Sequence, residues 1–108
     1  MGLFVWIARY TPEQSIGVEN RWNTMANGTA PKAVLEAWGR IKVLEMLPSP
    51  QNGFAMMVVD VPEDAWVDAA VCARYMADVW SVESYPVINM AQYAEMTKRL
   101  PLEQIPRK

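Results

Sequence analysis

Two segments of this chain are apolar at nearly every position, on both of the faces that a β-strand presents. Residues 3–10 read Leu-Phe-Val-Trp-Ile-Ala-Arg-Tyr, and residues 54–59 read Phe-Ala-Met-Met-Val-Val. Successive side chains of a strand point to opposite faces, so a strand with this pattern is covered on both sides. We therefore expect both segments to be central strands of a sheet whose two faces are buried.

Helices are predicted between and after these strands from their start and stop signals. Thr11-Pro12-Glu13-Gln14 combines an N-cap residue, a proline in the first turn and a glutamine at the third position, which is typical of a helix start. Pro62-Glu63-Asp64 starts another helix, whose inward stripe is predicted to hold Trp66, Ala69, Ala70, Ala73, Met76 and Ala77. The predicted helices span residues 12–26, 31–38, 62–79 and 89–100.

Two further strands carry features of sheet edges. Residues 40–47 include Lys42 and Glu45 and lead into a turn that ends at Asn52-Gly53, and residues 82–88 include Pro86, which removes a ladder donor. The order strand, helix, strand, strand, helix, strand is the split βαβ pattern. We expect an α+β fold, a ferredoxin-like βαββαβ antiparallel sheet with helices on one face and one additional C-terminal helix.

A homodimer follows from this arrangement. Helices in it cover one face of the sheet, whereas both central strands are apolar on both faces. Large contiguous apolar patches are rare on soluble monomers, so we expect a second copy of the chain, packed sheet to sheet, to cover the other face.

Composition limits the partners and the number of domains. The 108 residues include 52% hydrophobic residues and carry a net charge of −2 without long runs of one sign. We expect a single domain over residues 1–100 with a short tail at 101–108, and no nucleic-acid footprint. The apolar segments are too short to cross a bilayer, and Met1-Gly2-Leu3 shows no secretory signal, so we expect no membrane span and a cytoplasmic location.

Three stretches resemble a known family. They are the opening strand through Pro12, the Gly53-Phe54-Ala55 entry to the third strand, and Val82-Glu83-Ser84-Tyr85-Pro86-Val87. They are similar to an uncharacterised prokaryotic domain-of-unknown-function family of the dimeric α+β barrel superfamily. That superfamily includes cofactor-independent monooxygenases, isomerases, cyclases and haem-using enzymes. The resemblance therefore implies a fold and a pocket but no single activity.

The residue types that are missing exclude much chemistry. The chain has no histidine and one cysteine, Cys72. Nucleophile–histidine pairs, imidazole or multi-thiolate metal sites and intrachain disulfides are therefore not available, and we expect no metal and no cofactor. Cys72 has no basic neighbour of the kind that makes a thiolate, so we interpret it as a small buried hydrophobic residue.

Glu83 and Glu45 are the candidate catalytic residues, because they lie inside predicted strands. A carboxylate that faces an apolar cavity has a raised pKa suited to proton transfer. The alternative is that each faces solvent on an edge strand or pairs with Lys42 or Arg9. We expect Glu83 to face the interior beside Tyr85, with a tyrosine hydroxyl or Arg9 as its partner.

Trp6, Tyr10 and Tyr85, with Arg9, are the candidate ligand-binding residues. Aromatic side chains with polar tips can line a pocket for a planar or apolar ligand, although aromatic residues in strands also serve as core. The sequence favours a small-molecule-binding dimer, either a binding protein or a cofactor-independent isomerase, cyclase or monooxygenase. The alternative is a non-catalytic interaction module with a filled core. A cavity of a few hundred Å³ with a converging carboxylate favours the first hypothesis, and a solid core favours the second.

Overall fold

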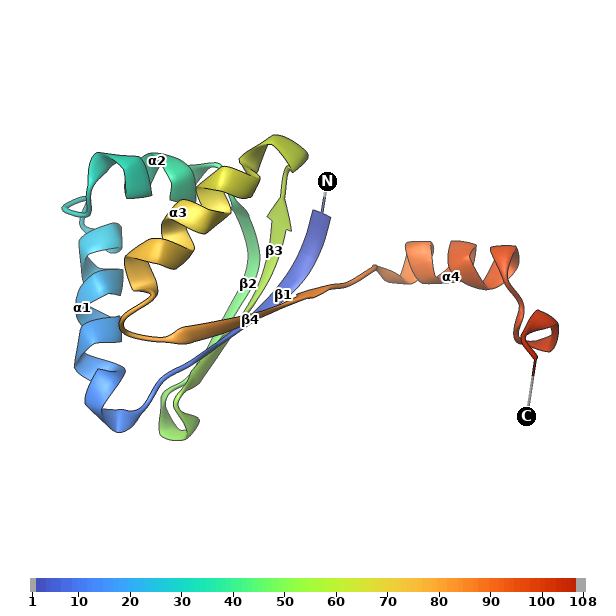
Figure 1. Ribbon diagram of the computed structural model, residues 1–108, viewed down its shortest axis with the longest axis horizontal. Helices are drawn as coiled ribbons and strands as arrows, with labels where there is room; N and C mark the ends of the chain where they lie inside the picture. Colours follow the sequence, from blue (N-terminus) through green and yellow to red (C-terminus); the bar gives the residue numbers. More distant parts are fainter. Residues whose placement is uncertain (1, 107–108) are drawn as a thin grey trace.

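Four strands form one antiparallel sheet in the order β2-β3-β1-β4. This arrangement is that of a computed structural model, which describes residues 2–106 (Figure 1). The two segments predicted to be central are central, and the strands with interior charge or proline are the edges. The strands are β1 (Gly2–Arg9), β2 (Lys42–Ser49), β3 (Phe54–Val61) and β4 (Ser81–Pro86).

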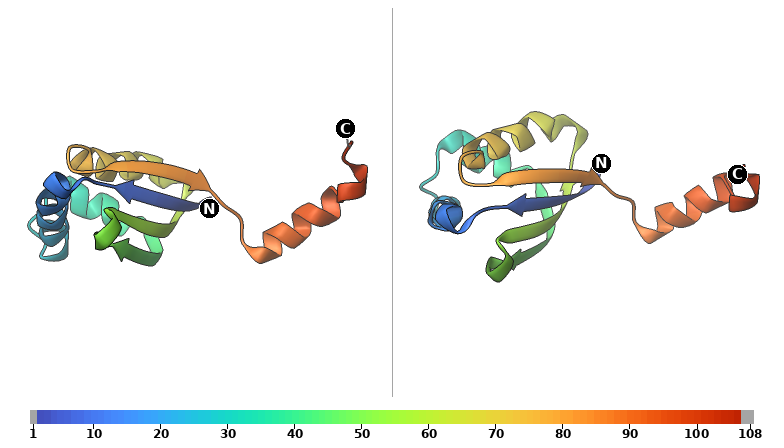
Figure 2. Two further views of the ribbon diagram at one scale, coloured as in Figure 1. Left: turned by 90° about the horizontal axis from the view of Figure 1, so that it is seen from below. Right: turned by 60° about the horizontal axis from the view of Figure 1, so that its bottom comes forward.

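Three helices cover one face of this sheet, and a fourth lies apart from it (Figures 1 and 2). Thr11 is the N-cap of the first helical segment, and its backbone N–H donates to Gln14 Oε1 at 2.9 Å. The first turns at 12–14 and 63–65 are 3₁₀, so α1 and α3 begin three or four residues after the predicted starts. The helices are α1 (Ser15–Ala26), α2 (Lys32–Gly39), α3 (Trp66–Met76) and α4 (Met90–Arg99).

The core lies between the sheet and these three helices. From the sheet, every second residue of β3 is buried, at Ala55, Met57, Val59 and Val61. Against them pack buried side chains of the helices, including Val18, Ala37, Cys72 and Met76. Alternation along the strands thus assigns one set of side chains to the helices and the other set to the opposite face.

The stripe predicted for α3 faces the sheet, although only part of it is buried. Cys72 and Met76 are the buried residues of α3, whereas Ala70, Ala73 and Ala77 are exposed. Trp66, Ala69, Ala70 and Ala73 are not closed off because they line a cavity on the sheet side of the helix, and Ala77 follows the last helical residue.

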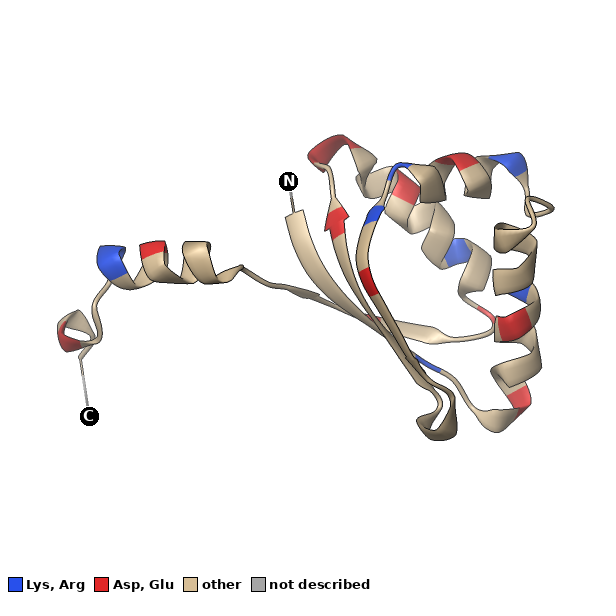
Figure 3. Cartoon of the chain, turned by 180° about the vertical axis from the view of Figure 1, so that it is seen from behind, with Lys and Arg blue, Asp and Glu red and all other residues tan. Residues whose placement is uncertain are grey.

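The second face of the sheet carries no helix (Figure 2). We call it the open face; its apolar members are Leu3, Val5 and Ile7 of β1, Phe54, Met56 and Val58 of β3, Leu47 of β2 and Tyr85 of β4. Figure 3 shows long uncharged stretches along the strands, with most charges on the helices. This face of the sheet is therefore uncovered in the single chain.

The C-terminal helix extends away from the rest of the chain (Figure 1). The radius of gyration is 17.1 Å, compared with about 13 Å for a compact domain of 100 residues. Every residue from 88 to 100 is exposed. Within the described chain, no helix has both the length and the apolar character needed to cross a membrane.

Candidate ligand pocket

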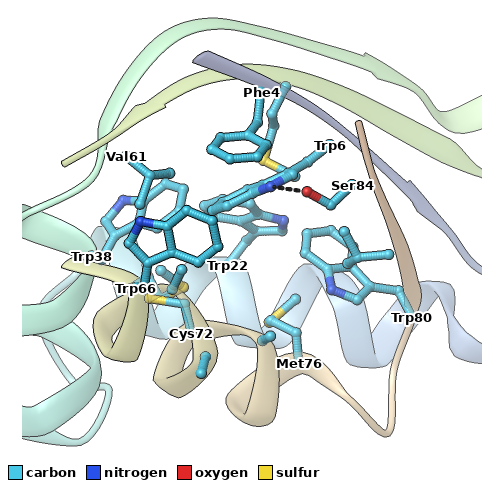
Figure 4. A pocket seen from close by; sticks show the side chains of 16 residues that line it. Phe4, Trp6, Trp22, Trp38, Val61, Trp66, Cys72, Met76, Trp80 and Ser84 are labelled. Carbon is cyan, nitrogen blue, oxygen red and sulfur yellow. Dashed lines mark hydrogen bonds between the residues drawn. The ribbon is translucent and has the colours of Figure 1, made fainter. Parts of the chain in front are cut away.

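A cavity of about 300 Å³ lies between α3 and the helix-facing side of β1, β3 and β4 (Figure 4). All five tryptophans of the chain contribute to its wall, although they come from β1, α1, α2, α3 and the residue before β4. The lining comprises Phe4, Trp6, Trp22, Met25, Trp38, Met57, Val61, Trp66, Ala69, Ala70, Cys72, Ala73, Met76, Trp80, Val82 and Ser84.

The indole rings support one another through edge-to-face contacts. The ring of Trp22 lies 5.4 Å from that of Trp38 at 75° and 5.9 Å from that of Trp80 at 67°. Phe4 and Trp66 meet at 5.8 Å and 87°. Such pairs are favourable beyond the area that they bury, so they hold the wall of the pocket in a defined shape.

The pocket contains few polar groups, and those in strands are paired with each other. Trp6 and Ser84 lie opposite each other in the β1–β4 pairing, and Trp6 Nε1 donates to Ser84 Oγ at 3.0 Å (Figure 4). Trp80 Nε1 is buried without a hydrogen-bond partner among the described residues. None of the described residues that line the cavity is charged. The wall therefore suits an apolar ligand.

The cavity exists because the side chains of α3 that line it are small. Ala69, Ala70 and Ala73 line it, where longer side chains would fill it. Trp66 is 59% exposed and Val82 is 40% exposed, and both belong to the lining, so the cavity is open to solvent. A ligand thus has an entrance that does not require the core to open.

The thiol of Cys72 is the most nucleophilic group in the cavity wall, but its surroundings suppress its reactivity. Burial, together with the nearby charge of Asp68, raises the pKa of the Cys72 thiol to about 11. A thiol with this pKa is almost wholly protonated at neutral pH and is a poor nucleophile. The interpretation of Cys72 as a small buried hydrophobic residue agrees with its 8% exposure.

Of the predicted ligand-binding residues, Trp6 alone lines this cavity. Tyr10 packs against the core at the end of β1 but is not part of the lining. Arg9 and Tyr85 lie on the open face, because their strand neighbours Ala8 and Ser84 face the helices.

Glu83 joins Arg9 and Tyr85 on the open face, so the expectation that it faces the interior is wrong for the single chain. Arg9 Nε donates to Glu83 Oε1 at 2.7 Å, and Tyr85 Oη donates to Glu83 Oε2 at 2.5 Å. These are the predicted partners. The Glu83 side chain is 42% exposed. The placement of Glu83 beside Tyr85 holds, but both point away from the cavity.

This polar cluster keeps the carboxylate ionised. The hydrogen bond from Tyr85, followed by the one from Arg9, lowers the pKa of Glu83 below its ordinary value. In turn, the bond to Glu83 raises the pKa of Arg9 and the pKa of Tyr85. A general base needs a pKa nearer to neutrality, so a lowered pKa of Glu83 fits an ion pair.

Glu45 lies far from this cluster. It is exposed on β2 and pairs in register with Val58, whose side chain is on the open face. Two strands separate β2 from β4, which places Glu45 and Glu83 about 14 Å apart at the usual strand spacing. The two carboxylates therefore do not form a catalytic pair within one chain. The described residues also contain no group of three acidic or cysteine side chains placed to hold a metal ion.

Four of the five wall tryptophans were not predicted as site residues. Trp22, Trp38, Trp66 and Trp80 lie in helices or just before a strand, where an apolar aromatic residue usually indicates core. The available signal was the number of tryptophans: five in 108 residues is more than a small core needs.

Comparisons with known proteins do not identify the chain. No protein-family model matches it, and neither the curated proteins nor the solved structures contain a significant match.

Proposed function

We propose that this protein binds a small, flat, apolar molecule in the tryptophan-lined cavity. The observation that carries the proposal is the convergence of all five tryptophans on one uncharged cavity of about 300 Å³. That volume is at the lower end of the roughly 300–1,000 Å³ range of ligand pockets. A molecule of the size and shape of naphthalene or fluorene suits it.

The indole walls favour aromatic ligands in particular. Offset-stacked and edge-to-face contacts with indole faces stabilise a planar aromatic ring more than a branched aliphatic group of equal area. A charged ligand would lose its hydration without gaining an opposite charge, since the described lining residues carry none. The proposal therefore concerns uncharged ligands.

The cavity distinguishes this proposal from an interaction module with a filled core. Side chains would occupy the space between sheet and helices in such a module, whereas here three alanines of α3 leave it open. The proposal is for binding without turnover, because Glu83 and Glu45 lie on the other side of the sheet. An isomerase, cyclase or monooxygenase of the predicted kind would need its acid or base at the ligand.

The proposal includes a fold family and an oligomeric state. The strand order β2-β3-β1-β4 with antiparallel neighbours supports a ferredoxin-like topology, as in dimeric α+β barrels. The uncovered apolar residues of the open face support a homodimer that buries this face.

Filling the cavity tests the binding proposal. The substitution Ala73→Leu adds a branched side chain to the wall, and we expect it to weaken binding of naphthalene at least about tenfold. Ala77→Leu is the matched control, because Ala77 is an exposed residue after the same helix and does not line the cavity. Quenching or enhancement of tryptophan fluorescence measures binding directly, since every tryptophan lines the cavity. Equal affinities in both variants would show that naphthalene binds elsewhere and would contradict the proposed site.

A further inference from the structure

We propose that the C-terminal helix α4 of each chain packs its apolar side on the open face of a second copy, so that two chains exchange arms. The inference rests on the homodimer proposed above, but it replaces the expected sheet-to-sheet contact by a contact between each open face and the C-terminal arm of the partner. It concerns a segment that makes no extensive contact with the rest of its own chain (Figures 1 and 2).

The helix has one apolar side and one polar side. Its apolar side chains recur every three or four residues, which places them on one stripe of a helix. The most exposed of them, Met90, keeps 78% of its exposure, and Leu100 keeps 54%. The stripe contains Met90, Tyr93, Met96 and Leu100, and the opposite side contains Gln92, Glu95, Lys98 and Arg99.

Such a helix requires a partner surface. It has 10 residues, and isolated helices shorter than about 12–15 residues are marginal in water. Its own stabilising features are one capping box at Asn89 and Gln92 and one exposed ion pair between Glu95 and Arg99. Each of these contributes little, so burial of the apolar stripe has to supply the rest.

The connection to β4 directs the helix away from its own sheet. Val87 N–H still donates to Leu3 O at 3.0 Å, so the chain continues the line of β4 up to this residue. Only Ile88 and Asn89 follow before the helix. Asn89 is extended, with φ −83° and ψ 175°, and is fixed by reciprocal hydrogen bonds with Gln92. Folding back onto its own sheet would require this short link to reverse its direction.

The open face of another copy is the surface that fits the stripe. It is apolar at its centre, it lacks a helix, and Leu47 and Tyr85 on it keep 49% and 46% of their exposure. A twofold axis makes the exchange reciprocal, because the arm of each chain meets the open face of the other. The contact then closes at two chains and leaves neither stripe uncovered.

Charge placed on the stripe tests the contact through the dimer dissociation constant. We expect the double substitution Tyr93→Glu and Met96→Glu to raise that constant at least about tenfold in sedimentation velocity. Lys98→Glu on the polar side of the same helix is the control and should leave it within about twofold. If the wild-type chain is a monomer, the dimer and the arm exchange are both overturned. If the wild type is a dimer that the double substitution leaves unchanged, the arm exchange alone is overturned.

A second measurement locates the arm without any substitution. Protein with ¹³C-methyl methionine is mixed and equilibrated with protein carrying unlabelled methionine, and contacts between copies are selected by isotope filtering. We expect nuclear Overhauser effects from the methyls of Met90 and Met96 to Tyr85 or Phe54 rings of the other copy. The absence of such effects between copies, or effects that reach a different surface of the other copy, would contradict the proposed contact.

Discussion

On the open face, the carboxylate of Glu83 accepts hydrogen bonds from Arg9 and Tyr85, the two partners that the sequence predicts. The prediction named the wrong face of the sheet. Because β1 is apolar on both faces, its pattern does not show which face the helices cover. The carboxylate therefore serves as the centre of an ion pair at the edge of the open face.

The pH dependence of stability follows from that ion pair. Because the pKa of Glu83 is lowered in the folded protein, its stabilising contribution is complete above its ordinary pKa of 4.5 and is lost as the pH falls through the folded value. We expect Glu83→Gln to lower the melting temperature at pH 7, where the carboxylate is charged, and to have a smaller effect as the pH falls below 4.5. Thermal denaturation of both proteins from pH 7 to pH 3 measures this. A melting-temperature difference that does not change with pH would contradict the ion-pair role.

Cys72 gives a second prediction for a single residue. A shift of its pKa from 9.0 to about 11 leaves about a hundredfold less thiolate below pH 9, and burial adds a steric barrier. We expect iodoacetamide at pH 8 to alkylate Cys72 in the native protein at least a hundredfold more slowly than in the denatured chain. Mass spectrometry of timed samples gives both rates. Equal rates would show that the thiol is open to solvent.

At the scale of elements, the sequence predicts the order of strands and helices and the strands that lie at the centre. Alternation, caps and edge residues such as Lys42 and Pro86 are local signals, and the structure agrees with them. The wall of the cavity depends on how separate elements pack. No local pattern in the sequence predicts that Trp22 of α1 contacts Trp80, the residue before β4. The wall of the cavity was therefore not predicted.

The turn between β2 and β3 gives a prediction for an element. Gly53 has φ 67°, a conformation that disfavours side chains, and a Cβ there would lie 2.6 Å from Tyr10 O. We expect Gly53→Ala to lower the free energy of unfolding by about 1–3 kcal/mol. Gly39→Ala is the control, because no heavy atom lies within 4 Å of its added Cβ. Urea denaturation that finds Gly53→Ala as stable as the wild type would contradict the observed turn.

At the scale of the whole molecule, the proposed homodimer covers the open face and the extended arm. We expect sedimentation equilibrium at micromolar concentration to give about twice the chain mass of 12.2 kDa. The apolar residues of the open face supply the driving force, so association should survive 1 M NaCl, which screens charges. A single species at the mass of one chain would contradict the proposed dimer.

The binding proposal is the central claim, and the five indole N–H signals test it most directly. In protein labelled with ¹⁵N at tryptophan, each signal reports on one part of the cavity wall. Naphthalene, indole and fluorene, added in turn, should produce saturable shifts of these signals for at least one probe, and the substitution Ala73→Leu should suppress them. If none of the three probes shifts any indole signal up to its limit of solubility, the cavity does not bind flat apolar molecules and the proposed function is wrong.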